Sequence, residues 1–152
     1  MAGFLGEYEV TLDSKGRFLV PGALKKQLPG EENSLVISRG FEKKLDMYPM
    51  KTWEIILERI SKLNDFDPKV RRFKLLFLGG ATEVLIDNAG RILLPPTLKE
   101  YAGLSKDIVL ASYIDKIIIW DSHKYKQFFE EQSSDDFSKL GAELMSGILS
   151  RE

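Results

Sequence analysis

Polar and apolar side chains alternate in residues 7–12, and the same pattern returns in residues 82–86. Alternation with a period of two is typical of a strand with one buried face. Each stretch leads into Asp, two further residues and Gly, and then into an apolar run that ends at a proline. Asp hydrogen-bonds its own backbone in turns, and Gly accepts positive φ. Each stretch therefore predicts a β-hairpin, with strands at 7–12 and 18–20 in the first and at 82–86 and 92–94 in the second.

The two predicted hairpins belong to an internal repeat. Residues 8–25 align with residues 82–99 at a constant offset of 74, with nine identities in 18 positions. Average residue usage gives roughly one match by chance. The alignment continues with small gaps, so that residues 35–37 correspond to residues 108–110. The chain is therefore a tandem duplication.

Each repeat continues in the same order after its hairpin. One or two helical turns follow the proline, then two short apolar strands, and then a longer helix with apolar residues at helical spacing. A four-stranded unit of roughly 50 residues has too little core to stand alone, so we expect the two repeats to interleave in an α+β, mostly β, fold. In the first repeat the predicted helices are 23–28 and 50–63, and the further strands are 34–38 and 44–48. In the second repeat the predicted helices are 97–102 and one that Ser122 caps, and the further strands are 107–112 and 116–120.

A further helix is predicted between the repeats, and another in the tail. Asp67 and Pro68 form a cap and first-turn pair for a helix that runs to about Leu78. In the tail, apolar residues recur on one helix face, but Gly141 and Gly147 weaken the pattern, so we expect it to be partly helical or frayed. The predicted organisation is a first unit at 7–63, a connecting helix at 64–80, a second unit at 81–131 and a C-terminal tail at 132–152.

Composition narrows the classes of function. The chain of 152 residues contains no cysteine and one histidine, which excludes disulfides, thiolate metal sites and cysteine nucleophiles. It shows no glycine-rich phosphate loop, nucleophile elbow or metal-ligand spacing, and only spaced carboxylates such as Glu7, Glu9 and Asp13 suggest acid–base chemistry. We therefore expect no enzyme activity, no cofactor, no metal and no small-molecule substrate.

The sequence also predicts a cytoplasmic protein with no membrane partner. The apolar runs at 75–82 and 108–114 are far shorter than the ~18 residues that a membrane span needs. Residues 1–7 lack the basic flank and apolar core of a signal peptide.

The net charge of −1 favours neither a nucleic acid nor a membrane, but the charges are unevenly placed. Of the 22 Lys and Arg and the 23 Asp and Glu, residues 130–152 hold two and six, which leaves 20 bases and 17 acids, a net charge of +3, in residues 1–129. This sign agrees with DNA binding, although the magnitude is modest.

Each repeat contains a strand, the segment Asp-x-x-Gly-Arg and a second strand that ends at proline. This pattern resembles the MraZ family of bacterial regulators, which are associated with the division and cell-wall gene cluster. That family carries a doubled Asp-x-x-x-Arg signature, present here at Asp13 to Arg17 and at Asp87 to Arg91. The resemblance covers about residues 6–129 and does not extend to the tail. Further matching segments are Leu45-x-x-Tyr48-Pro49 followed by Trp53, Arg71-Arg72-Phe73, Gly80-Ala81-Thr82-Glu83 and Tyr101-Ala102-Gly103-Leu104.

The resemblance implies a double swapped-hairpin barrel related to AbrB-type regulators and built from the tandem repeat. It implies a homo-oligomer that closes into a ring and binds double-stranded DNA at direct repeats in the promoter of its own operon, with nucleoid association. The candidate DNA-binding residues on the two turns are Asp13, Ser14, Lys15, Gly16, Arg17, Asp87, Asn88, Gly90 and Arg91.

Two interpretations of these turns remain open. In one, the Asp accepts backbone N–H bonds and pairs with the Arg, so that the motif only locks the turn. In the other, two stiff hairpins hold Arg17 and Arg91 outward, where Arg makes paired hydrogen bonds to guanine edges or phosphates. Both hold together if the Asp orients the Arg.

The first repeat presents more positive charge than the second. Lys15 has Ala89 as its counterpart, and Arg39 has Ser112. We therefore expect Lys15 and Arg17 to dominate DNA binding.

The remaining candidates have structural interpretations. A cation run in the connecting helix is expected to be a solvated face rather than a nucleic-acid patch, and His123 an exposed helix residue. Five aromatic residues at core spacing are expected to pack rather than to stack on bases. A competing function is an oligomeric interaction or antitoxin-like module without DNA specificity of its own, which the amphipathic tail would suit. The cations are Lys69, Arg71, Arg72 and Lys74, and the aromatics are Trp53, Phe73, Trp120, Tyr125 and Phe128.

Overall fold

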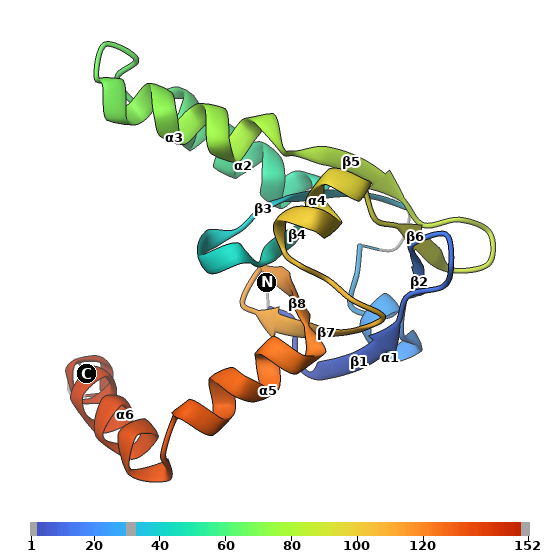
Figure 1. Cartoon of the computed structure of the whole chain (residues 1–152). Coiled ribbons are helices and arrows are strands. Elements are labelled where there is room, and N and C mark those ends of the chain that lie inside the picture. Colours follow the sequence, from blue (N-terminus) through green and yellow to red (C-terminus); the bar gives the residue numbers. More distant parts are fainter. Residues whose placement is uncertain (1–2, 30–32, 150–152) are drawn as a thin grey trace. The chain divides into compact units, whose positions relative to one another are not determined.

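The computed structural model describes residues 3–29 and 33–149, which form two compact units, one up to Ser122 and one from His123. The strands of the described residues lie in the first unit. Its elements in chain order are β1 (Glu7–Thr11), β2 (Arg17–Leu19), α1 (Gly22–Lys25), β3 (Ser34–Arg39), a 3-10 turn (Phe41–Lys43), β4 (Leu45–Pro49), α2 (Met50–Ser61), α3 (Pro68–Gly79), β5 (Thr82–Leu85), β6 (Arg91–Leu93), α4 (Pro96–Tyr101), β7 (Asp107–Tyr113) and β8 (Lys116–Asp121) (Figure 1).

This order confirms the predicted repeat of strand, strand, short helix, strand, strand and helix. The first copy runs from β1 to α2, and the second from β5 to α5 (Ser122–Glu131). The predicted helix between the copies is α3, and Asp67 caps it as expected by accepting a hydrogen bond from the Lys69 backbone N–H at 2.9 Å.

The strands of the two repeats pair with each other rather than within each predicted hairpin. A six-stranded antiparallel sheet has the order β1-β7-β8-β4-β3-β5, and β2 pairs with β6 in a separate two-stranded ribbon. The prediction that residues 7–12 pair with residues 18–20 is therefore wrong, because β1 pairs with β7 and β2 with β6. The period of two identified β1 and β5 but could not identify the strands with which they pair.

The closed barrel that the resemblance implied is absent from the described part of the chain. The six-stranded sheet has two ends, β1 and β5, and no ladder joins them. Both end strands run into turns, and their continuations, β2 and β6, pair with each other. The observed fold is a mixed α+β structure with an open antiparallel sheet.

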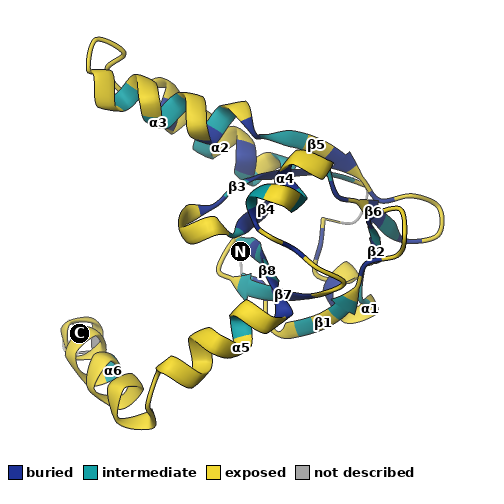
Figure 2. Ribbon diagram, viewed as in Figure 1, coloured by how far each residue is buried: buried dark blue, intermediate teal, exposed yellow. Residues whose placement is uncertain are grey.

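The main hydrophobic core contains side chains from both repeats, as the interleaved pairing requires. Figure 2 shows that buried positions lie mainly on the strands. Phe18 and Ile92 are the inward residues of the β2–β6 ribbon, and each is at most 1% exposed. Full burial of a side chain of this size stabilises the fold by about 1.5–3 kcal/mol. The ribbon is thus fixed to the core by its inner face.

A smaller cluster holds the helical hairpin of α2 and α3 to the sheet. The ring of Trp53 lies 5.7 Å from that of Tyr48 and 5.6 Å from that of Phe77. Phe73 stacks on Phe77 at 5.6 Å. Trp53 and Phe73 therefore pack in a hydrophobic cluster, as predicted.

The second unit contains most of α5 and all of α6 (Ser134–Leu149). α6 is one continuous helix that runs through Gly141 and Gly147. Its start explains part of this, because the Ser133 hydroxyl accepts from the Asp136 N–H at 3.0 Å while Asp136 accepts from the Ser133 N–H at 3.2 Å. No described helix is long and apolar enough to cross a membrane.

Candidate nucleic-acid interface

Turn 1, residues 13–17, is organised around the carboxylate of Asp13. Its Oδ1 accepts from the backbone N–H groups of Lys15 at 2.9 Å and Arg17 at 3.0 Å, and its Oδ2 accepts from Arg17 Nε at 2.8 Å. The Asp13 N–H also donates to the Arg17 carbonyl at 2.8 Å. One side chain therefore fixes the turn and the base of the arginine together.

Turn 2, residues 87–91, repeats this geometry. Asp87 Oδ1 accepts from the N–H groups of Ala89 and Arg91, both at 2.9 Å, and Oδ2 accepts from Arg91 Nε at 3.3 Å. The ion pair is 0.5 Å longer than the 2.8 Å pair of turn 1. The orientation of the arginine is thus held more tightly in turn 1.

Each turn is also tied to the strand of the other repeat. Gly16 and Gly90 occupy the left-handed region, with φ of 84° and 81°, where a side chain would be strained. Their carbonyls accept from Leu94 N–H at 3.0 Å and from Val20 N–H at 2.9 Å. These bonds extend the β2–β6 ribbon into both turns, so the two turns form one rigid element.

The arginine side chains keep donors available beyond this lock. Nε of each donates to its Asp, and neither terminal nitrogen of Arg17 or Arg91 donates to another residue within 3–29 and 33–149. Their side chains are 27% and 36% exposed. A guanidinium held through Nε can still offer its two terminal amino groups to a phosphate or a guanine edge. The structural lock and an outward role are therefore compatible.

The same contacts lower the pKa of both carboxylates. The Arg17 backbone N–H is the largest cause for Asp13, and the Arg91 backbone N–H is the largest cause for Asp87. Hydrogen bonds to the ionised form favour it. Because the folded-state pKa lies below the unfolded value of about 3.9, each carboxylate stabilises the fold above that pH, and this contribution is lost as the pH falls towards the folded pKa.

A variant with Asp13→Asn and Asp87→Asn tests this linkage. We expect wild-type stability to fall with decreasing pH below about pH 4, and the double variant to fall less steeply because the two titrating groups are gone. Urea unfolding at a series of pH values measures the slope. Glu54→Gln, at an exposed position on α2, is the control and should keep the wild-type slope. An unchanged slope in the double variant would contradict the assignment.

The predicted asymmetry between the repeats is only partly visible. Lys15 is exposed at turn 1, where turn 2 has the exposed Ala89. Arg39, in contrast, is half-buried and contacts other residues of the chain: its Nη1 donates to the Leu76 carbonyl at 2.8 Å, and its guanidinium lies 5.8 Å from the centroid of the Tyr101 ring. Arg39 is therefore less available than Lys15, and turn 1 itself has one more lysine than turn 2.

Two of the four cations on the connecting helix hold the loop before it. Arg71 Nη1 donates to the Asp65 carbonyl at 2.7 Å, and Lys74 Nζ donates to the Asp65 carboxylate at 2.5 Å. The run of like charges in the sequence does not indicate that two of these side chains bind a neighbouring loop. Arg72 is exposed on α3 and Lys69 precedes it on the same helix.

The other candidates give no clustered chemistry. His123 is exposed on α5, as predicted, and Phe128, which is 41% exposed, packs edge-on against the ring of Phe129 with the centroids 5.8 Å apart. Glu9 accepts from the Ser122 hydroxyl at 3.1 Å. The described residues contain no group of three or more metal-ligating side chains. Ser14 and Asn88 lie exposed at the tips of the two turns.

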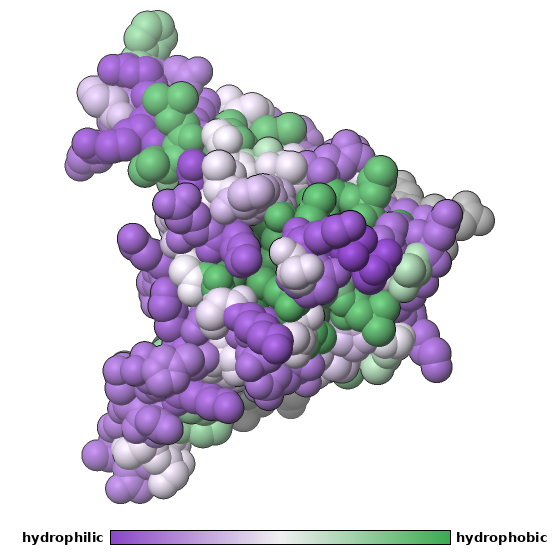
Figure 3. Space-filling view, turned by 45° about the vertical axis from the view of Figure 1, so that its right-hand side comes forward, coloured by the Kyte–Doolittle hydropathy of each residue, from purple (hydrophilic) through white to green (hydrophobic). Residues whose placement is uncertain are grey.

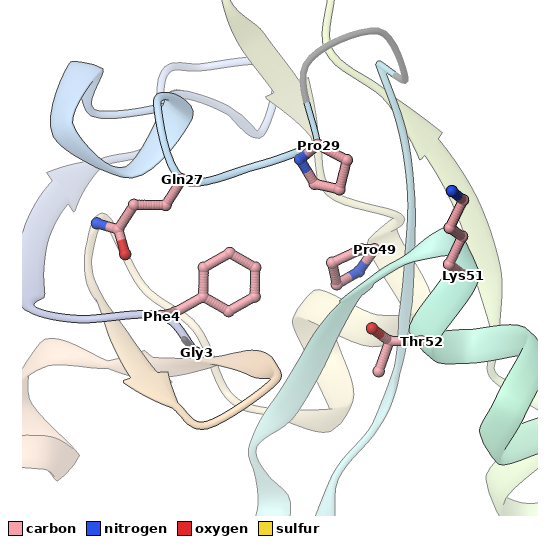
Figure 4. A pocket seen from close by; sticks show the side chains of 7 residues that line it. All are labelled: Gly3, Phe4, Gln27, Pro29, Pro49, Lys51 and Thr52. Carbon is pink, nitrogen blue, oxygen red and sulfur yellow. The ribbon is translucent and has the colours of Figure 1, made fainter. Parts of the chain in front are cut away.

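A cavity of about 400 Å³ lies apart from the turns (Figure 4). Its polar side chains are few, and one of them, the Gln27 amide, is engaged with the backbone of Leu5 at 2.8 and 3.2 Å. Its lining brings no acid–base pair together. The lining residues are Gly3, Phe4, Gln27, Pro29, Pro49, Lys51 and Thr52.

Two repeats interleave in an antiparallel structure, and each repeat presents a turn whose arginine is held by an aspartate. These features define a class of duplicated proteins with paired arginine turns. Comparison with known proteins identifies the family within this class. The family described as "MraZ protein, putative antitoxin-like" matches it twice, at residues 3–76 and 77–146. These two matches agree with the tandem repeat.

Full-length relatives agree with this match. A protein of Christiangramia forsetii is 44% identical over 147 residues, covering 95% of this chain and 94% of the relative. Proteins of Flavobacterium psychrophilum and Sodalis glossinidius are 39% and 40% identical over 150 and 144 residues, covering 97% and 93% of this chain and 95% and 92% of the relatives. All three are named "Transcriptional regulator MraZ". The chain belongs to the MraZ family.

Proposed function

We propose that this chain is a transcriptional regulator of the division and cell-wall gene cluster that binds double-stranded DNA through turns 1 and 2. The observation that carries the proposal is the pair of arginines, each fixed through Nε by its own Asp and each left with two terminal amino groups. The names of the full-length relatives support the regulatory role. A DNA partner also implies a cytoplasmic, nucleoid-associated protein.

The rigidity of the turns favours DNA reading over a purely structural role. Holding a long side chain in one orientation reduces the entropy that is lost when it binds. Lys15 adds an exposed charge beside Arg17, where phosphate contacts would increase affinity without adding sequence preference. We infer that turn 1 contributes more binding energy than turn 2.

We further propose that several copies assemble into a closed ring and engage direct repeats in the promoter. One two-turn element per subunit is a small contact surface, and single contacts of this size are weak. Several elements on one particle bind with a raised effective concentration, so weak contacts sum to a useful affinity. Analytical ultracentrifugation would give the number of subunits, and a monomer at micromolar concentration would contradict this part of the proposal.

The first experiment is selection of bound fragments from a random double-stranded DNA library at moderate salt. We expect enrichment of a repeated motif, and tighter binding to the selected DNA than to a scrambled copy in fluorescence anisotropy. The salt dependence of both affinities separates phosphate contacts from base contacts. Equal affinity for the two DNAs would remove the claim of specificity.

A second function is favoured by one observation, the exposed apolar face of α6. Phe137, Leu144 and Ile148 are each more than half exposed in the second unit. Such a face suits an oligomeric interaction or antitoxin-like module. Purification with a stoichiometric protein partner, together with no measurable DNA affinity, would support that function against the first.

A further inference from the structure

The β2–β6 ribbon carries two exposed leucines on the same face as the two arginines. Leu19 is 59% exposed and Leu93 is 54% exposed. They stand at equivalent positions of the two repeats, 74 residues apart, so the feature occurs twice in one chain. The lock of the turns does not require them, because it uses only backbone groups and the Asp and Arg side chains.

The register places all four side chains together. Arg17 lies opposite Leu93, and Leu19 lies opposite Arg91. Directly opposed residues of an antiparallel pair project to the same face, and residues two apart on one strand do so as well. The inner face is occupied by Phe18 and Ile92, which are buried. The outer face therefore has an alternating set of two cations and two aliphatic groups.

Each leucine also lies beside a turn of the other repeat. A Cβ placed on Gly90 would lie 3.5 Å from Leu19 Cδ1, so the side chain of Leu19 reaches the glycine of turn 2. Figure 3, in which the side of the molecule that carries β2 and β6 is turned forward, shows hydrophobic side chains next to strongly hydrophilic ones. An aliphatic contact and a guanidinium contact would therefore fall on neighbouring positions of one ligand.

The major groove of DNA offers this combination of partners. It admits a two-stranded β-ribbon, and its edges present guanine acceptors to Arg and the C5-methyl group of thymine to apolar side chains. The phosphates on either side can accept from the Lys15 ammonium and from the terminal amino groups of the two arginines. Contact with such a groove would bury the exposed leucines.

We propose that Leu19 and Leu93 read thymine methyl groups in the major groove, next to the bases or phosphates that the two arginines contact. This inference rests on the proposed DNA binding and adds a preference for thymine at defined positions. It gives the two leucines a part in sequence reading beside the arginines, which Asp13 and Asp87 hold in place.

The test compares the selected DNA with copies in which one thymine at a time is replaced by uracil. Uracil keeps every hydrogen-bonding group and lacks only the methyl group, and the synthetic DNA contains no 5-methylcytosine. We expect at least one replacement on each half of the motif to weaken binding by about fourfold, which corresponds to about 0.8 kcal/mol for one buried methyl group. Leu19→Ala and Leu93→Ala should each abolish the preference at one of these positions.

One control variant and three separate outcomes make the test decisive. Leu75→Ala removes a leucine that is 74% exposed on α3, and it should keep the wild-type preference. Equal binding of wild type to all thymine and uracil DNAs would overturn this inference while leaving the DNA-binding proposal intact. A changed oligomer mass in Leu19→Ala or Leu93→Ala would overturn it too, because the leucines would then lie in a subunit contact. Failure to select any DNA would instead overturn the proposed function.

Discussion

Arg17→Ala is expected to weaken binding to the selected DNA by about 30-fold for each subunit that engages a site, which corresponds to about 2 kcal/mol. The reason is the loss of a guanidinium that Asp13 already holds in place through Nε at 2.8 Å. Arg91→Ala is expected to cost less, about fivefold or 1 kcal/mol, because its pair is longer and its turn has no lysine. Fluorescence anisotropy across a salt series measures both losses.

The controls for this pair of variants come from the chain itself. Arg72→Ala removes an exposed cation from α3, outside the ribbon, and should leave affinity unchanged. Circular dichroism and sedimentation should show that Arg17→Ala keeps its fold and subunit number. If both turn variants bind like wild type while Arg72→Ala binds weakly, the turns are structural and the DNA surface lies on α3.

The elements of the fold were predictable from local patterns, but their partners were not. Alternation at residues 7–12 and 82–86 correctly indicated β1 and β5, and the repeat correctly implied two interleaved copies. The ladder of β1 with β7 depends on burial of side chains from both repeats at once, and no short window of sequence contains that information. The helix α6 is continuous despite its two glycines, because each glycine destabilises a helix by only about 1 kcal/mol.

The candidate site was predictable where its chemistry is local. Asp13 and Arg17 are four residues apart, and a turn brings residues at that spacing together. The internal role of Arg39 was not predictable, since its acceptor is the carbonyl of Leu76, 37 residues away. The common face of Leu19 and Arg91 also escapes sequence analysis, because it depends on the register of strands from two repeats.

A charged pair joins strands of the two repeats, and no sequence pattern indicated it. β4 pairs with β8, with Asp46 opposite Ile118. The Asp46 side chain is 8% exposed, and its Oδ2 accepts from Lys116 Nζ at 3.1 Å and from the Tyr48 hydroxyl at 3.2 Å. Burial, with the Asp46 charge adding to it, raises the pKa of Tyr48 well above its usual range, so the phenol stays protonated and donates.

Lys116→Met is therefore expected to lower the free energy of unfolding by about 3 kcal/mol, because it leaves a buried carboxylate without its cation. The double variant Asp46→Asn with Lys116→Met should recover much of this loss, since no buried charge remains. Lys62→Met is the matched control: it breaks the exposed pair with Glu58, whose side chains are 73% and 69% exposed, and should cost less than about 1 kcal/mol. Urea unfolding followed by circular dichroism measures all three. Because the pair joins strands of both repeats, its loss should lower the stability of the first unit as a whole. A cost no larger than that of Lys62→Met would show that the pairing of β4 with β8 does not depend on this charge.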